Sequence, residues 1–241
     1  MDGQREPRDD GRAAQGSRGH DGDRGHDGGR GHHGLTNAEQ WDTRYRDSDR
    51  VWSGEPNTAL VRETADLAPG RALDLGCGEG GDAIWLARRG WHVTAADFSS
   101  VALERAARHA AEAGVPAERL DWQRHDLGQT FPEGEFDLVS AHFLHSYDDM
   151  PGARILRSAV TAVAPGGVLL VVGHSGRPSW DPDPRPGIRF PAPEEVLAGL
   201  ELPEGVWEVL RCENYERIQP SPDGQTGTRT DNTVKVRRPR V

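Results

Sequence analysis

The first 34 residues of the chain contain no Trp, Tyr, Phe, Leu, Ile or Val, so this stretch has no large apolar side chains with which to build a core. Three near-copies of a six-residue unit rich in Gly, Arg, His and Asp follow one another over residues 18–34. Such polar repeats do not bury enough apolar surface to offset the entropy lost on ordering. We therefore predict a disordered tail over residues 1–34 and one folded domain over residues 35–241.

Basic charge, cysteine and long apolar runs are also scarce. The chain has 29 Lys and Arg against 39 Asp and Glu, which argues against a nucleic-acid-binding protein because such a protein needs a basic face. The only cysteines, Cys77 and Cys212, lie far apart in the sequence and predict no disulfide framework. No apolar run approaches the about 20 residues of a membrane-spanning helix, and the charged N-terminus holds no apolar signal segment. We expect a cytoplasmic protein that binds neither nucleic acid nor membranes.

From residue 35 onward, helical patterns alternate with short apolar runs. Helices are predicted over residues 37–45, 59–67, 82–89, 100–113 and 150–163, with Thr58 and Ser99 or Ser100 as caps. Strands are predicted over residues 71–75, 91–96, 120–124, 136–141, 168–172, 206–218 and 232–238. The alternation indicates an α/β fold with right-handed crossovers and a mostly parallel sheet. The last two strands have no helix between them, so we expect an antiparallel hairpin that turns at residues 220–224.

Three glycines, Gly76, Gly78 and Gly80, follow the first predicted strand and precede a helix. Glycine lets the backbone turn tightly and approach a ligand, and a helix N-terminus offers unpaired N–H groups. This pattern alone fits NAD, FAD or S-adenosylmethionine equally well. Asp74 lies two residues before the loop, and a carboxylate there suits a cationic ammonium better than a pyrophosphate, which it would repel.

Two further acidic residues follow the next two strands. Asp97 ends the second strand, where an acidic side chain accepts hydrogen bonds from ribose hydroxyls. Asp126 follows the third strand, where its carboxylate can accept from an adenine amino group while Leu127 packs on the ring. Asp97 and Asp126 thus indicate an adenosine moiety, and Asp74 favours S-adenosylmethionine as the cofactor.

The succession of these motifs resembles class I S-adenosylmethionine-dependent methyltransferases. The resemblance covers residues 37–241 and also includes the segments 136–140 and 163–170. It implies a Rossmann-like, seven-stranded, mostly parallel sheet with an antiparallel final strand and helices on both faces. Since the acidic charge favours small neutral or cationic substrates, our leading hypothesis is a small-molecule methyltransferase. The segment with Trp41, Tyr45 and Trp52 resembles the leader of tellurite-resistance and thiopurine methyltransferase-like members, which closes over cofactor and substrate.

The resemblance assigns roles by position. Gly76, Cys77 and Gly78 would line the cofactor loop, Asp97 would hold the ribose, and Phe98, Asp126 and Leu127 would surround the adenine. Residues 140–142, ending at His142, would lie beneath the sulfonium. Tyr45 and Trp52 would border the methionine end.

Histidines that follow the fourth and fifth strands are candidates for a general base. His142 and His145 follow the fourth strand and His174 the fifth, at the edge where ligands bind in open α/β sheets. No catalytic residue and no metal ligand is assigned, and residues 173–191 are expected to roof the acceptor pocket. Two alternatives stay open: an NAD-dependent oxidoreductase, and a non-catalytic cofactor- or metal-binding protein that uses the His-rich tail.

Overall fold

The computed structural model describes residues 36–144, 152–181 and 189–240. The predicted tail at residues 1–34 and the candidate His145 lie outside these ranges. The strands are β1 (Arg71–Leu75), β2 (His92–Asp97), β3 (Leu120–Arg124), β4 (Phe136–His142), β5 (Val163–His174), β6 (Glu208–Pro220) and β7 (Thr226–Arg237). The helices are α1 (Asn37–Arg46), α2 (Thr58–Thr64), α3 (Gly81–Arg88), α4 (Ser100–Glu112), α5 (Gly152–Thr161) and α6 (Pro193–Gly199), with a short 3₁₀ helix η1 (Ala117–Arg119). None of these helices is long and apolar enough to cross a membrane.

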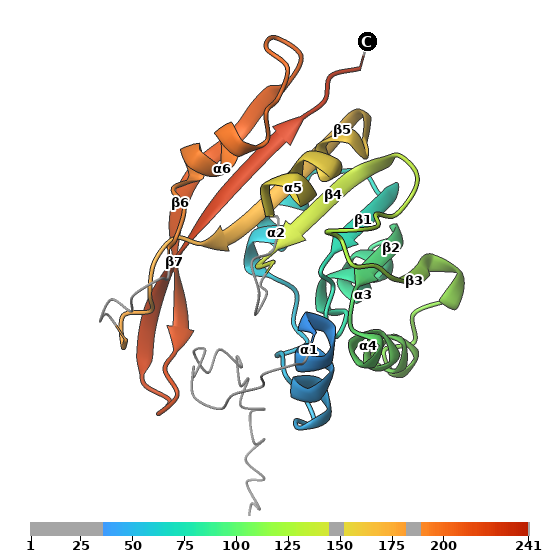
Figure 1. Ribbon diagram of the computed structural model, residues 1–241, viewed down its shortest axis with the longest axis vertical. Coiled ribbons are helices and arrows are strands. Elements are labelled where there is room, and N and C mark those ends of the chain that lie inside the picture. The colour runs from blue at the N-terminus through green and yellow to red at the C-terminus, as the bar shows by residue number, and fades with distance from the viewer. Residues whose placement is uncertain (1–35, 145–151, 182–188, 241) are drawn as a thin grey trace, which may run out of the picture.

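All seven strands form one sheet in the order β3-β2-β1-β4-β5-β7-β6 (Figure 1). The first five strands are parallel, and β7 is antiparallel to both of its neighbours, β5 and β6. The predicted mostly parallel sheet with an antiparallel final strand is therefore confirmed. Because the strand order reverses between β1 and β4, the loops at their carboxyl ends border the crevice where α/β sheets bind ligands.

Alternate residues of each central strand supply two separate cores. Ala72 and Leu138 face one side of the sheet, where α2 and α3 add Leu60 and Leu86. On the opposite side, Leu73, Val139 and Leu169 pack with Ala159 of α5 and with side chains of α6. A strand buried on both faces carries a continuous apolar run, which explains why β1, β4 and β5 were evident in the sequence.

The predicted boundaries differ from the structure at several elements, among them β6, which spans Glu208–Pro220 rather than 206–218. The N-cap of α2 is Asn57 rather than Thr58, and α2 ends at Thr64 rather than at residue 67. Strand β5 begins at Val163 because Val163 pairs with Phe136 ahead of an irregularity in the ladder. Strand β7 begins at Thr226, because its polar first half pairs with β6 and also binds residues 175–179. Helix α5 was predicted over residues 150–163; Met150 lies outside the described residues, and the helix ends at Thr161 because Val163 begins β5.

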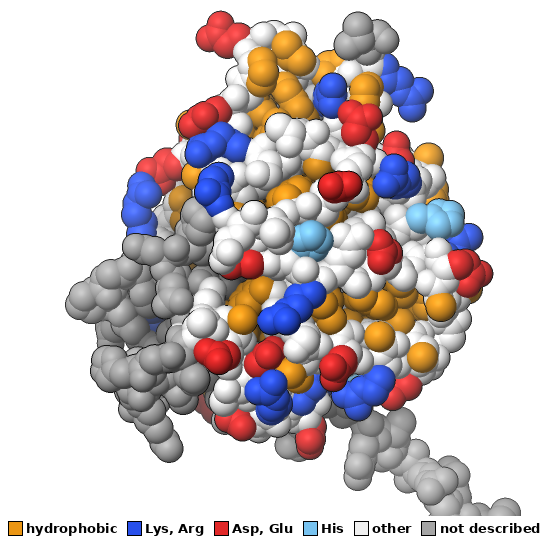
Figure 2. All heavy atoms as spheres, turned by 45° about the vertical axis from the view of Figure 1, so that its right-hand side comes forward, with side chains coloured by type: hydrophobic (Ala, Val, Ile, Leu, Met, Phe, Trp, Pro, Cys, Tyr) orange, Lys and Arg blue, Asp and Glu red, His pale blue; other side chains and the backbone are white. Residues whose placement is uncertain are grey.

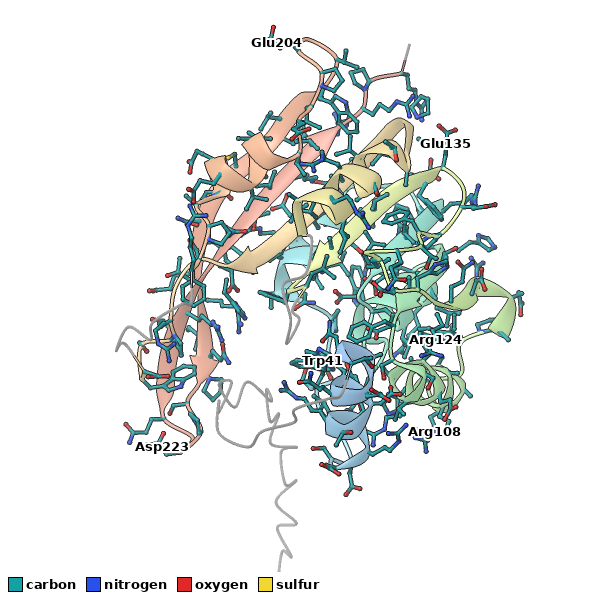
Figure 3. All side chains as sticks on the ribbon, viewed as in Figure 1. Trp41, Arg108, Arg124, Glu135, Glu204 and Asp223 are labelled. Carbon is teal, nitrogen blue, oxygen red and sulfur yellow. The ribbon has the colours of Figure 1, made fainter. Side chains whose placement is uncertain are left out.

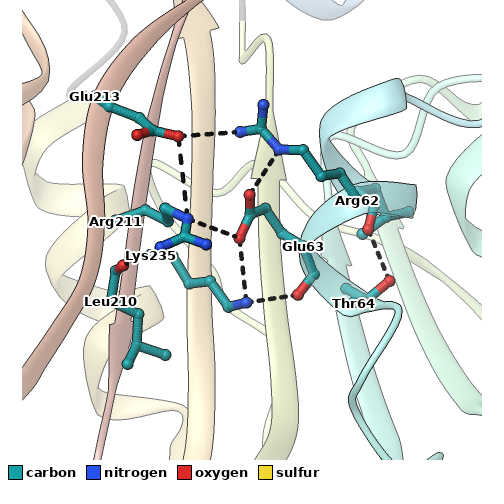
Figure 4. Close-up of polar contacts among 8 residues, drawn as sticks. Arg62, Glu63, Thr64, Leu210, Arg211, Glu213 and Lys235 are labelled. Atoms are coloured by element: carbon teal, nitrogen blue, oxygen red, sulfur yellow. Dashed lines mark hydrogen bonds and ion pairs between the residues drawn. The ribbon is translucent and has the colours of Figure 1, made fainter.

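A polar cluster fastens α2 to the terminal hairpin (Figure 4). Glu63 is 5% exposed, and its carboxylate lies 2.7 Å from Arg62 Nε and 3.2 Å from Lys235 Nζ. Lys235 also donates to the backbone carbonyl of Glu63 at 2.6 Å. The guanidinium of Arg62 lies over the ring of Tyr215 on β6, 4.5 Å from its centroid. The helix that follows the leader (residues 41–57) is thereby held against β6 and β7.

Candidate functional site

The glycine loop joins β1 to α3 in a left-handed backbone conformation. The φ angles of Gly76, Gly78 and Gly80 are 72°, 51° and 86°. At these values the backbone of a residue with a Cβ atom would be strained. Gly80 is the N-cap of α3. The amides of Gly76 and Cys77 donate to the carbonyl of Ala96 at 2.8 and 3.1 Å, so the loop is fixed to the end of β2.

Asp97, at the end of β2, is in direct contact with this loop. Its carboxylate accepts hydrogen bonds from the amides of Gly78 and Ser99, both at 2.9 Å. Burial raises the pKa of Asp97 to about 6, against the lowering effect of these two amides. The structure thus joins the predicted ribose ligand to the predicted cofactor loop.

Asp74 lies beneath the loop and is 2% exposed. One of its carboxyl oxygens accepts from the Ser140 hydroxyl at 3.3 Å, and the other, Oδ2, has no hydrogen-bond partner among the described residues. Burial, followed by the charge of Asp82, raises the pKa of Asp74 to about 7. An unsatisfied buried acceptor of this kind is costly and indicates a ligand that brings a donor.

His142 ends β4 beside Asp74 and is held by a carboxylate of α3. Its Nδ1 lies 2.7 Å from Asp82 Oδ2, and Asp82 also accepts from the backbone amide and the side-chain amide of Asn57, both at 2.7 Å. Burial opposes ionisation, yet the bonds from His142 and Asn57 hold the pKa of Asp82 below its ordinary value. His142 Nε2 is buried without a hydrogen-bond partner in the described part of the chain. Sequence reasoning missed Asp82 and Asn57, although an acidic residue in the first turn after a glycine loop was a visible signal.

The predicted leader residues close directly over the loop. The Trp52 indole donates to the Tyr45 hydroxyl at 3.0 Å, and a Cβ atom on Gly78 would lie 3.1 Å from Trp52 Nε1 and 3.2 Å from the Tyr45 oxygen. Trp41, on α1 (Figure 3), packs with both rings at centroid distances of 5.9 and 6.2 Å. Burial and the charge of Asp97 raise the pKa of Tyr45 well above its usual value.

Glu79, inside the glycine loop, holds the leader turn and was also missed. Its carboxylate accepts from the backbone amides of Val51 and Trp52 at 3.0 and 2.9 Å and from Arg105 at 3.0 Å. Arg105 in turn donates to the carbonyl of Ser48 at 2.6 Å. Glu79, to which the sequence analysis gave no role, therefore fixes the position of the leader turn.

The three predicted adenine-binding residues make their contacts in different parts of the structure. Phe98 packs with Trp41 and Tyr45 in the cluster between α1 and α4. The Asp126 carboxylate accepts from the Gly128 amide at 3.0 Å and the Gln129 side chain at 2.6 Å, so its hydrogen bonds stay within its own turn. Leu127 packs against the core on the α5 side of the sheet.

The remaining candidates include a thiol and a second histidine. Burial and the charges of Asp97 and Asp74 raise the pKa of Cys77 well above its usual value, which agrees with a loop residue rather than a nucleophile. His174, at the end of β5, lies 2.7 Å from Asp231, and its ring is 4.4 Å from that of Phe143. Among the described residues, no group of three or more His, Cys, Asp or Glu could hold a metal ion.

Comparison with known proteins identifies the segment that carries this site. Residues 72–167 match the methyltransferase domain family. These residues form a class I methyltransferase domain. The domain runs from β1 through the start of β5 and contains the glycine loop, Asp97 and His142. The family resemblance expected from the sequence is confirmed.

The chain also aligns, over about half of its length, with methyltransferases of several kinds. A probable chloroplastic tocopherol O-methyltransferase of Oryza sativa subsp. japonica is 34% identical over 116 residues, 47% of this chain and 31% of its own length. A ubiquinone biosynthesis O-methyltransferase of Marinobacter nauticus is 33% identical over 46% of this chain and 47% of its own length. Ribosomal RNA small subunit methyltransferase C of Chromohalobacter salexigens is 32% identical over 49% of this chain and 36% of its own length. The aligned segment spans less than half the length of these relatives.

Solved structures extend the likeness over most of the fold. N-methyltransferase NodS of Bradyrhizobium japonicum, in complex with S-adenosyl-L-homocysteine, has a TM-score of 0.59 at 21% identity and covers 85% of this chain and 100% of its own. TehB of Haemophilus influenzae has a TM-score of 0.60 at 16% identity, and the alignment covers 86% of this chain and 68% of TehB. Both therefore share the Rossmann-like fold of this chain.

Proposed function

We propose that this protein is an S-adenosylmethionine-dependent methyltransferase that acts on a small molecule in the cytoplasm. The observation that carries the proposal is the pair of buried carboxyl groups on either side of the glycine loop. Asp97 accepts a hydrogen bond from the Gly78 amide of the loop. Asp74 Oδ2 has no hydrogen-bond partner among the described residues. That oxygen suits the ammonium group of the methionine moiety, whereas it would repel the pyrophosphate of NAD.

The residues of the site would divide the cofactor among them. Asp74 and the loop residues Gly76, Cys77 and Gly78 would hold the methionine end, and His142 would border it. Asp97 would bind the ribose hydroxyls. The adenine would lie among the side chains of Phe98, Asp126 and Leu127. Tyr45, Trp52 and His145 would contact the acceptor.

When bound, S-adenosylmethionine supplies an electrophilic methyl group on a sulfonium centre. Tyr45 and Trp52 cover the loop at Gly78, so they would exclude water and hold the acceptor in line with the methyl group. Glu79 fixes the leader turn through two backbone amides, so these aromatic side chains are positioned before the ligand arrives.

Surface charge favours a small acceptor over RNA, although relatives of both kinds are known. The chain carries a formal net charge of −10, and acidic and basic side chains are interspersed on the face drawn in Figure 2. A protein that holds structured RNA neutralises phosphates with a basic surface. The names of the tocopherol and ubiquinone relatives are consistent with this preference.

Calorimetry with S-adenosylhomocysteine tests the proposal. We expect the wild-type protein to bind S-adenosylhomocysteine but not NADH. Asp97→Ala should weaken binding at least tenfold, and Asp97→Asn, which keeps the side-chain size, should weaken it as well. Asp121→Ala is the matched control, because Asp121 is an exposed carboxylate on the neighbouring strand β3. Unchanged affinity in a folded Asp97→Asn variant would contradict the assignment.

A further inference from the structure

We propose that His142 accepts the proton that the methyl acceptor loses, with Asp82 as the residue that positions it. The inference rests on the proposed function and names the acceptor class: a neutral O–H or N–H group rather than a thiolate or chalcogen anion. It begins from an atom that the fold leaves unsatisfied. His142 Nε2 is buried and has no hydrogen-bond partner within the described residues.

The hydrogen bonds of Asp82 fix which nitrogen of His142 carries the proton. An ionised carboxylate is an acceptor only, and Asp82 accepts two hydrogen bonds from Asn57. The nitrogen that faces it at 2.7 Å, His142 Nδ1, must therefore be the donor. In the neutral ring the lone pair then belongs to Nε2, and a buried lone pair without a donor is available to a ligand.

The position of His142 places this lone pair at the reaction centre of the proposed enzyme. Ser140 pairs in parallel register with Asp74, and Ala141 with Leu75. His142 directly follows Ala141, and Gly76, the first residue of the glycine loop, directly follows Leu75, so the two lie next to the last pair of this ladder. The crevice at this edge, between β1 and β4, is where the strand order reverses and ligands bind. A sulfonium bound along the loop and an acceptor beside it would both lie next to Nε2.

The step balances without any further reactant. The acceptor oxygen or nitrogen forms a bond to the methyl carbon while the carbon–sulfur bond breaks and its electrons remain on sulfur. The electrons of the O–H or N–H bond stay on the acceptor atom, and its proton moves to His142 Nε2. The resulting imidazolium keeps its Nδ1–H bond to the Asp82 carboxylate, and the proton later passes to water.

The charges around His142 favour this proton transfer. Asp82 of α3 is held ionised by its donors, and the carboxyl group of Asp74 on β1 also interacts electrostatically with His142. His174 of β5 lies close by, because its ring packs against Phe143, the residue after His142. Asn57, at the start of α2, is neutral. The positive charge that the ring would gain in this step would therefore face the ionised Asp82 carboxylate, 2.7 Å from Nδ1. Ionised thiols react without a base, so this arrangement would add little to their methylation.

Turnover with matched acceptors tests the base. Release of S-adenosylhomocysteine is measured with phenol, aniline and thiophenol for the wild type, His142→Gln, Asp82→Asn and His92→Gln. His92 is exposed and begins β2, at the end of that strand away from Asp97 and the site. It serves as the control. We expect His142→Gln to lower kcat with phenol or aniline about 100-fold or more, and with thiophenol less than about threefold. Asp82→Asn should lower kcat with phenol and displace the pH–rate profile, with KM changed little.

Equal losses with all three acceptors, or loss of S-adenosylhomocysteine binding in His142→Gln, would overturn the inference. If none of the three is methylated, ¹⁵N NMR of the histidine rings in the full-length protein decides, with His142→Gln used for assignment. A ring protonated at Nδ1 supports the proposal, and a ring protonated at Nε2 contradicts it. Failure of the proposed function is distinguished by calorimetry, because the wild type would then not bind S-adenosylhomocysteine at all.

Discussion

The indole N–H of Trp52 donates to the hydroxyl of Tyr45 at 3.0 Å, and both groups lie within 3.3 Å of the position that a Cβ atom on Gly78 would occupy. The leader and the glycine loop therefore fit together only because residue 78 has no side chain.

Replacing Gly78 with alanine should impair ligand binding more than folding. The φ of 51° costs an L-residue about 1–2 kcal/mol, and the new methyl group would displace Trp52 and Tyr45. We expect at least tenfold weaker binding of S-adenosylhomocysteine by calorimetry. Gly114→Ala is the control, because Gly114 has a φ of 67° but nothing within 4 Å of its Cβ position. Equal affinities in the two variants would show that Tyr45 and Trp52 do not depend on this glycine.

Replacing Glu79 with alanine should release the leader turn. The change leaves Arg105 and the amides of Val51 and Trp52 without their acceptor, and breaking a buried ion pair on one side costs about 3–5 kcal/mol. We expect a matching loss in chemical denaturation and faster tryptic cleavage at Arg50. Glu213→Ala removes a half-exposed carboxylate and should cost no more than about 1 kcal/mol. Cleavage at the wild-type rate in Glu79→Ala would refute the role of Glu79.

Affinity for S-adenosylhomocysteine should rise with pH up to about 7. Burial raises the pKa of Asp74 from an ordinary 3.8 to about 7, and the ligand ammonium favours the ionised carboxylate. Below pH 7 binding therefore releases a proton, and the affinity should increase by up to about tenfold per pH unit. Calorimetry from pH 5.5 to 7.5 measures this slope. Asp74→Asn should flatten the slope, and an unchanged slope in that variant would exclude Asp74 as its source.

The same carboxyl group should make the ligand-free protein less stable as the pH rises. The folded state keeps the Asp74 proton up to about pH 7, whereas the unfolded chain releases it near its ordinary pKa. The contribution of this group to the free energy of unfolding is thus complete below that ordinary value and is lost as the pH rises through about 7. Urea denaturation should show a shallower pH dependence in Asp74→Asn than in the wild type.

Replacing Lys235 with methionine should loosen α2 from the hairpin. Glu63 would keep Arg62 but lose two hydrogen bonds from Lys235, and a hydrogen bond to a charged group is worth about 1.5–3 kcal/mol. We expect a loss of about 2–3 kcal/mol in urea denaturation. Arg237→Met, on the same strand as Lys235, removes a half-exposed ion pair with Glu208 of β6 and should cost at most about 1 kcal/mol. Similar losses in both variants would contradict a special role for Lys235.

The order of the sheet and the cofactor loop could be predicted because their signals are local. Apolar runs such as 168–172 and glycines at 76, 78 and 80 report the burial and backbone conformation of their own residues. Strand β7 was predicted too short because Thr226–Asp231 carries no apolar run. This half of the strand is covered by residues that are distant in the sequence, including Trp180, which packs against Gly227.

The hydrogen bonds that organise the site could not be predicted, because each joins residues far apart in the sequence. Glu79 meets Val51, Asp82 meets both Asn57 and His142, and Asp42 accepts from Ser99. A carboxylate near a loop can bind a ligand, cap a helix or hold a distant amide, and only the folded arrangement separates these roles. Asp74 and Asp97 were found because strand ends at a sheet edge converge.

Because Lys235 contacts Glu63, its side chain can serve as a chemical probe of the contact between α2 and β7. Lys235 is the only lysine of the chain, and its amine is held against α2. The rate at which an amine-reactive label modifies this residue therefore reports how often α2 separates from β7. Mass spectrometry of the single peptide that carries Lys235 would measure that motion without any engineered site.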